Sequence, residues 1–469
     1  MLRLTRDSVI YGLGSIAGKV TAVVLVPVLT RSLSTDDFGR LEVLSAMSST
    51  IVSVLTLGVD RAALRLFFRE SGPARKNLLA SWYLFATLAI VPAGLICIIA
   101  ADPLSTALFG SGSYGRAITL VGGVVVFSMY QFVALAILRA QRRAAVYAAL
   151  NGLTLAIYAG LTIALVFGLG ASIEVVLAAA LVTWGMSAAV GLALVSDVAI
   201  ARPSLAGIRA LLTIGLPLAP AVVFIWGADF ANRLIVLGFA GATQVAYLGL
   251  GLRAASVAGL AVTGLQLAWE PHAYGAGTAH ESLARLAQDA RRSLVLVTTM
   301  VVAVALVSRE GVLLVSGDPY VPALPTLGFC YLATIATALF IITSTPSAIA
   351  ASMGEIGRAS IAGAVIATVS TLALTPPFGA AGAACAAAIG QLAAALLVGW
   401  SGARRVVLPV PWRPTSMVLA GGAAVSLAAT LGDPGIAVRA GLGVAFVALL
   451  LLEGTVPEIA RRLFARARS

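Results

Sequence analysis

A few basic residues lie deep inside long apolar segments of this sequence, where a charge needs a partner. Lys19, Arg233 and Arg253 each fall well within such a segment. A Lys or Arg near the centre of a membrane-spanning helix costs about 2.5–3.5 kcal/mol on insertion scales, so its side chain should face water or an opposite charge. These positions predict a hydrated surface that binds an anionic group, inside an otherwise apolar protein.

Two of these residues have an alternative explanation. Arg233 follows Asp229 by one helical turn. An acid and a base at this spacing neutralise each other, which favours a structural pair over a gating or coupling role for Asp229. Lys19 fits two interpretations equally well: it lines a wet cavity, or its amine forms a salt bridge or snorkels to the membrane surface.

Arg253 belongs to a polar stripe. Ser256, Thr263 and Glu270 recur on the same face of its apolar segment. Such a stripe should look into a hydrated cavity, where Arg253 would contact an anionic substrate.

Another charged group closes the second apolar segment. A helix would place Arg61 and Arg65 on one face, next to Asp60. Snorkelling to the nearby membrane boundary explains both arginines. Two guanidinium groups at a cavity mouth would also form a first capture site for phosphate, because each offers paired hydrogen-bond donors. The candidates for coupling or gating are Asp60, Asp229 and Glu270.

The composition places all of these residues in a membrane protein. The 469 residues are 60% hydrophobic and 11% charged, with a mean hydropathy of +1.02. This leaves too little polar surface for a water-soluble fold of that length. The net charge of +12 comes from basic residues beside apolar segments, which predicts anionic lipid headgroups rather than nucleic acid as partners.

Signatures of enzymes, cofactors and metals are absent from the sequence. Cys97, Cys330 and Cys385 lie in apolar segments without metal-ligand spacing, and the two histidines share a loop without cysteine partners. The glycines before Lys19 lack the spacing of a phosphate-binding loop. We expect no enzymatic activity and no cofactor or metal, and any uphill work would draw on a proton or sodium gradient.

Fourteen apolar segments are long enough to cross a bilayer as helices. The predicted spans are 8–30, 41–66, 77–101, 116–139, 145–168, 173–196, 211–238, 243–269, 292–314, 322–350, 359–376, 381–402, 415–431 and 436–454. Most of the 31 basic residues fall at the termini or in every second gap, which the positive-inside rule assigns to the cytoplasm. The sequence therefore predicts a multi-pass protein of the cytoplasmic membrane with both termini inside.

The first six spans align weakly with the next six at an offset of roughly 205–210 residues, which indicates an internal repeat. An even number of spans per repeat makes the repeats parallel. We predict an all-α fold with an N-lobe of residues 1–200 and a C-lobe of residues 201–403 around a central cavity. Residues 404–469 would add two helices and a basic cytoplasmic tail.

Several motifs carry a resemblance to a known family. They are Tyr11-Gly-Leu-Gly-Ser15, Val26-Pro27 through Phe38-Gly39, Leu57-Gly58-Val59 with Arg65, Trp269-Glu270-Pro271, and Pro377-Phe378-Gly379 through Gly382. In order and spacing they resemble the polysaccharide flippases of the multidrug/oligosaccharidyl-lipid/polysaccharide exporter superfamily, over spans one to twelve. The chain departs from that family at Asn232, where relatives often carry Asp, and at Ser370 and Thr371, where they often carry asparagines.

The resemblance implies a function. It implies alternating-access transport of a polyprenyl-pyrophosphate-linked oligosaccharide from the inner to the outer leaflet, for a surface polysaccharide such as lipopolysaccharide or exopolysaccharide. A polysaccharide polymerase, glycosyltransferases and membrane lipids would be its partners. The cationic cavity would hold the diphosphate through Lys19, Arg61, Arg65, Arg233 and Arg253.

Three other functions are alternatives. An ion-coupled multidrug efflux pump for organic cations would favour acidic residues at membrane depth, whereas this chain has more basic ones there. A flippase for the peptidoglycan precursor lipid II would share fold, charge and mechanism, so it stays open. A membrane-embedded polymerase or glycosyltransferase would need a loop with paired carboxylates, and the longest predicted loop, about residues 272–291, has no such site.

Overall fold

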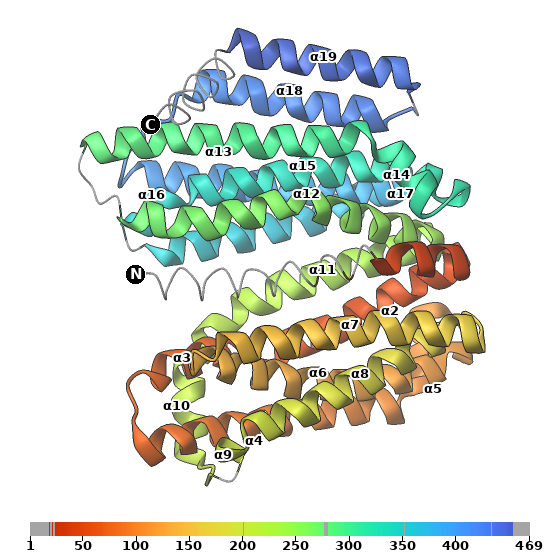
Figure 1. Ribbon diagram of the computed structural model, residues 1–469, viewed down its shortest axis with the longest axis vertical. Helices are drawn as coiled ribbons and strands as arrows, with labels where there is room; N and C mark the ends of the chain where they lie inside the picture. The colour runs from red at the N-terminus through yellow and green to blue at the C-terminus, as the bar shows by residue number, and fades with distance from the viewer. Residues whose placement is uncertain are drawn as a thin grey trace. The chain divides into compact units, whose positions relative to one another are not determined.

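The computed structural model describes residues 18, 21, 24–199, 201–275, 280–350, 352–432 and 434–453. All regular elements in these ranges are helices (Figure 1). Nine of them are long and apolar enough to cross a membrane, or ten if the bent pair α13–α14 forms one span. The protein is therefore an all-helical polytopic membrane protein.

The contacts divide the chain into two units, one ending at Ala246 and the other beginning at Tyr247. The helices that begin in the first unit are α2 (Thr35–Leu55), α3 (Val59–Phe67), α4 (Gly72–Ile99), α5 (Ala101–Phe109), η1 (Gly112–Tyr114), α6 (Gly115–Ala140), α7 (Ala144–Leu169), α8 (Ile173–Leu194), α9 (Ser196–Ala199), α10 (Leu205–Gly215), η2 (Leu216–Leu218), α11 (Ala219–Ala240) and α12 (Ala242–Gly275). Those wholly in the second are α13 (His280–Leu306), α14 (Ser308–Val315), η3 (Asp318–Ala323), α15 (Leu324–Thr343), α16 (Thr345–Ile349), α17 (Met353–Ala403), α18 (Trp412–Thr430) and α19 (Ile436–Leu452).

This division differs from the boundary that the repeat predicts after residue 200. Helix α10 packs on α3 and α4, and α11 packs along α2, so the contacts join both helices to the first unit. The predicted lobes rest on sequence similarity rather than on contacts, and they stay a prediction.

One central helix organises each unit. In the first, α6 packs against α2, α4, α7 and α8, and in the second, α15 packs against α13, α17 and α18. These two helices occupy the predicted fourth and tenth spans, which are equivalent positions in the proposed repeat. The duplication itself stays a prediction.

Helices occupy every predicted span from the second to the fourteenth, but several are interrupted. The second span is wrong as a continuous helix: it breaks at Thr56–Gly58, where Leu57 and Gly58 have positive φ angles of 47° and 70°. The seventh divides at η2, which contains Pro217. The ninth bends by 54° between α13 and α14. The number fourteen stays a prediction, because the first span lies largely outside the described residues.

Two predictions about connections have clear outcomes. Helix α17 contains both the eleventh and the twelfth predicted spans, and the predicted break between them is confirmed at Gly379, whose φ of 56° and ψ of −134° are not helical. The predicted loop over residues 272–291 is wrong, since α12 extends to Gly275 and α13 begins at His280. Its charged residues continue a helix by one-turn ion pairs such as Arg285–Glu281.

Small residues bring helices into close contact. A methyl group on Gly363 would lie 2.7 Å from the carbonyl oxygen of Gly390 on the other half of α17. Gly94 and Gly122 make an equivalent close approach between α4 and α6. Without a side chain, the two backbones can pack at van der Waals distance inside a bilayer.

Candidate functional site

The first candidate surface is the exposed face of α3, which carries Arg61 and Arg65. Both side chains are exposed, and neither has an ion-pair partner in the described part of the chain. Asp60 begins the same helix and is half-buried. The predicted placement of both arginines on one face is confirmed. Two guanidinium groups one turn apart present several hydrogen-bond donors to an anion such as a phosphate group.

The sequence of α3 explains why this face points outward. The helix is strongly amphipathic: Val59, Ala62, Ala63 and Phe67 are buried on its other side. Apolar side chains three and four residues apart form one stripe that packs on the bundle. The arginines therefore face away from the packed interior of the unit.

The break that separates α3 from α2 is held by a neighbouring helix. A methyl group on Gly215, at the end of α10, would lie 2.9 Å from the carbonyl oxygen of Leu57 and 3.0 Å from the backbone nitrogen of Val59. Only glycine allows this approach without displacing the backbone. Since α10 itself ends here and gives way to η2, two interrupted helices meet at their breaks.

Helix α11 carries the predicted acid–base pair. Arg233 Nη1 lies 2.5 Å from Asp229 Oδ2 and also donates to the Asp229 carbonyl oxygen at 3.2 Å. Arg233 is 13% exposed and Asp229 is 46% exposed. The predicted ion pair is confirmed, and its two charges cancel locally, whereas its structural role stays a prediction. Arg233 contributes less positive field than α3 does.

Arg253 lies in the first half of α12 and is half-buried. The hydroxyl of Ser256 donates to the Arg253 carbonyl oxygen at 2.6 Å, and the hydroxyl of Thr263 donates to the Gly259 carbonyl oxygen at 3.0 Å. Backbone carbonyl groups of the helix thus accept the hydrogen bonds that both hydroxyls donate. Arg253 belongs to the second unit and α3 to the first. That Arg253 lines the same surface as the arginines of α3 therefore stays a prediction.

Two predicted site residues fall outside what the structure describes. Lys19 lies beyond the described residues, and the side chain of Glu270 is likewise undescribed. Their neighbour Trp269 is buried and donates from its indole nitrogen to Thr345 Oγ1 at 2.8 Å. The Trp269-Glu270-Pro271 motif therefore includes a packing contact between α12 and α16.

Three acidic residues were missed by sequence reasoning. Glu42 is only 7% exposed on α2, and its position in an apolar span was the available signal. Glu310 on α14 accepts hydrogen bonds from both Nη atoms of Arg439, which lies near the start of α19. The Arg439 side chain is 4% exposed. The Glu355 carboxylate forms an ion pair with Arg405, with Oε1 2.8 Å from Nη2. These pairs join residues far apart in the chain, so no local spacing predicts them.

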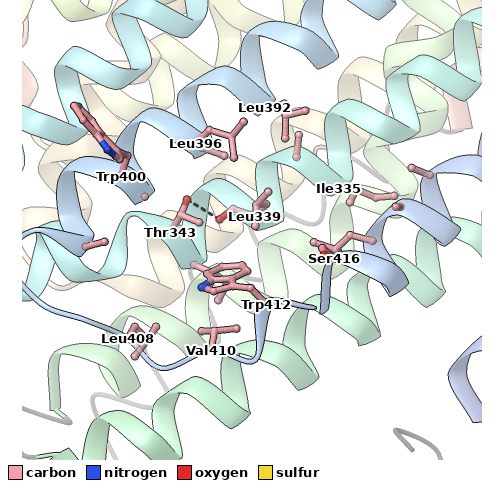
Figure 2. Close-up of a pocket in the computed structure, with 18 of the residues that line it drawn as sticks. Ile335, Leu339, Thr343, Leu392, Leu396, Trp400, Leu408, Val410, Trp412 and Ser416 are labelled. Carbon is pink, nitrogen blue, oxygen red and sulfur yellow. Dashed lines mark hydrogen bonds between the residues drawn. The ribbon is translucent and has the colours of Figure 1, made fainter. Parts of the chain in front are cut away.

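The second unit also contains an apolar groove of about 900 Å³ (Figure 2). Its walls come from α15, α17, α18 and the linker between α17 and α18. Figure 2 labels Thr343 on this surface, and its hydroxyl donates to the Leu339 carbonyl oxygen at 3.0 Å. The groove lining therefore offers a ligand almost only hydrocarbon. Nothing in the sequence alone indicated this groove.

No family model matches the sequence, and the search of curated proteins found no match either. Solved structures do match. A structure of the lipid II flippase MurJ in an inward closed conformation aligns with a TM-score of 0.70 at 14% identity, covering 98% of this chain and 100% of that chain. The chain therefore has a MATE/MurJ-like fold.

Two further structures share this fold. An inward-facing multidrug resistance MATE family transporter aligns with a TM-score of 0.64 at 15% identity, covering 84% of this chain and 94% of that one. The eukaryotic MATE transporter AtDTX14 aligns with a TM-score of 0.55 at 15% identity, over 92% and 99%. At this identity the MATE/MurJ-like likeness establishes the fold, whereas the narrower polysaccharide flippase family stays a prediction.

Proposed function

We propose that this protein is a flippase that moves a polyprenyl-pyrophosphate-linked oligosaccharide from the inner to the outer leaflet by alternating access. The observation that carries the proposal is the pair of exposed arginines on α3, Arg61 and Arg65, on a fold shared with a flippase and with transporters. A diphosphate is the part of this substrate that two adjacent guanidinium groups would bind. Lys19 and Arg253 would extend the same positive field. The fold also agrees with the prediction that the chain is not an enzyme.

The charge balance argues against export of organic cations. A cation pump needs a carboxylate that is available to the substrate, whereas Asp229 is already paired with Arg233 at 2.5 Å. The ion pair with Arg233 offsets the negative charge of Asp229. The charged residues of α3 are two arginines and one aspartate, so its net charge is positive. An anionic substrate fits this balance better.

A peptidoglycan precursor on the same kind of lipid carrier is the second candidate. The specific observation in its favour is the alignment with the lipid II flippase MurJ over 98% of this chain. Both substrates present a diphosphate between a polar group and an isoprenoid tail, so the arginines would serve either one. Polymerase and glycosyltransferase partners apply only to the oligosaccharide.

The test is transport by purified protein in liposomes. A fluorescent polyprenyl-pyrophosphate oligosaccharide and fluorescent lipid II would be supplied separately, with a fluorescent organic cation as the third substrate. We expect the oligosaccharide to be flipped, and Arg61→Gln/Arg65→Gln to slow this at least tenfold, because loss of each charge-assisted hydrogen bond costs about 1.5–3 kcal/mol. Arg69→Gln, an exposed arginine outside α3, is the matched control.

Four results would contradict the proposal. Preferential flipping of lipid II assigns the second candidate, and transport of the organic cation assigns an efflux pump. Full transport by Arg61→Gln/Arg65→Gln would remove α3 from the substrate path. Lys19→Ala, Arg65→Ala and Arg253→Ala are expected to lower transport singly at unchanged abundance, and full activity in all three would contradict the cationic cavity.

A further inference from the structure

The linker between α17 and α18 has an unusual sequence for a loop that the charge rule assigns to the cytoplasm. Residues 406–412 read Val-Val-Leu-Pro-Val-Pro-Trp, with arginines at 404, 405 and 413. The side chain of Val407 is 70% exposed. A short apolar stretch flanked by arginines is typical of a segment that lies in the membrane interface rather than in water.

This linker forms one wall of the apolar groove, next to two tryptophans. Trp400 on α17 and Trp412 on α18 both line the groove, and they are 63% and 42% exposed (Figure 2). Tryptophan concentrates at the level of lipid headgroups, because its ring is apolar and its N–H group is polar. This preference favours an opening at headgroup level. The groove continues along apolar side chains such as Leu396, which is 60% exposed.

Arg404, Arg405 and Arg413 flank the groove-lining residues along the chain, and their charge is only partly neutralised within the protein. Arg405 is paired with Glu355 at 2.8 Å, and Ser347 also donates to that carboxylate at 3.1 Å. Arg404 instead stacks on Trp400, with its guanidinium carbon 3.7 Å from the ring centroid. Neither Arg404 nor Arg413 has an ion-pair partner among the residues that the structure describes.

We propose that this groove binds an anionic membrane phospholipid, with its phosphate at Arg404 and Arg413 and its acyl chain along α15 and α17. The volume of about 900 Å³ is large enough for such a ligand. Basic pockets between helices at the cytoplasmic side are where anionic headgroups bind membrane proteins. The stacking of Arg404 on Trp400 orients the guanidinium beside the groove without neutralising it. The lipid would be a bound component of the protein, separate from its transported substrate.

The test uses tryptophan fluorescence of the full-length protein in bilayers that contain lipids brominated on their acyl chains. Brominated phosphatidylglycerol is expected to quench at a lower mole fraction than brominated phosphatidylcholine, and Trp400→Phe/Trp412→Phe should remove this difference. Arg404→Gln/Arg413→Gln should lower the preference for the anionic lipid by about fivefold per arginine. Arg69→Gln/Arg202→Gln removes the same charge from exposed positions of the first unit and should keep the preference.

Two outcomes would overturn the proposal. Equal preference for phosphatidylglycerol in the wild-type protein and in Arg404→Gln/Arg413→Gln would show that these arginines hold no headgroup. Relief of quenching by unbrominated polyprenyl phosphate, at mole fractions where unbrominated phosphatidylglycerol has no effect, would assign the groove to an isoprenoid chain. Because neither readout requires transport, failure here and failure of the proposed flippase activity are distinguishable.

Discussion

At the scale of residues, the difference between paired and exposed charges is what separates structural from functional candidates. Arg233 and Arg439 each bind a carboxylate, whereas Arg61 and Arg65 lie exposed on α3. Burying a charge in an apolar environment is tolerated when a partner neutralises it. The paired arginines therefore explain stability, and the exposed ones are where an external anion would bind.

The pair on α11 leads to a stability prediction. Asp229→Asn should destabilise the protein, because Arg233 would keep its charge in an apolar segment, and Asp229→Asn/Arg233→Gln should recover most of the loss. The coupling energy is expected to be about 1 kcal/mol, as for other polar pairs within membranes. A double-mutant cycle of unfolding in mixed micelles measures it. Unchanged stability of Asp229→Asn together with lost transport would instead make Asp229 a coupling residue.

At the scale of elements, interrupted helices and glycine contacts shape the bundle. The breaks at Thr56–Gly58 and Leu216–Leu218 meet through Gly215, and Gly379 turns one apolar stretch into two packed halves. Interrupted helices survive at membrane depth only where neighbouring elements pack on the freed backbone. We infer that these contacts set the orientation of α3 and hence of its arginines.

The glycine contact within α17 can be tested directly. A methyl group in Gly390→Ala would collide with the carbonyl oxygen of Gly363 and with the side chain of Ala367, so we expect a loss of about 1–3 kcal/mol. Gly357→Ala is the control on the same helix, since no atom lies within 4 Å of its added methyl group. Thermal unfolding in detergent compares the two. Equal unfolding midpoints for the two variants would show that the close contact between the two halves of α17 does not contribute to stability.

The same comparison applies to the break beside α3. Gly215→Ala should displace Leu57 and Val59, whereas Gly227→Ala on α11 meets open space and should be neutral or slightly stabilising. The measured quantity is the transport rate of the fluorescent oligosaccharide in the liposome assay, at equal protein abundance. A wild-type transport rate in Gly215→Ala would mean that the break does not position Arg61 and Arg65.

At the scale of the whole molecule, the distribution of basic residues predicts orientation. A variant without its three native cysteines, Cys97, Cys330 and Cys385, would carry one new cysteine at a time. Ser113→Cys should react with an impermeant thiol reagent in intact cells, because its loop lacks the cluster of basic residues that is retained inside. Ser71→Cys should react only after permeabilisation. The reverse pattern would invert the predicted topology.

Much of the fold followed from local patterns, and the failures had one tertiary and one local cause. The predicted gap between the eleventh and twelfth spans contains Gly379, where the helix breaks. The break at Leu57 was missed, because one glycine inside an apolar run is an ordinary packing residue until a neighbour packs against it. The loop predicted near His280 was wrong because one-turn ion pairs let charged residues continue α13.

The sequence by itself determined the membrane class, the positions of the apolar helices and the pair between Asp229 and Arg233. Each of these depends on hydropathy or on spacing within one helix, which a linear pattern contains. Tertiary structure alone decided that Glu310 neutralises Arg439 over a separation of 129 residues, and that α15, α17 and α18 enclose a groove. Such features require helices distant in the chain to pack together, and hydropathy specifies that a face is apolar without specifying its neighbour.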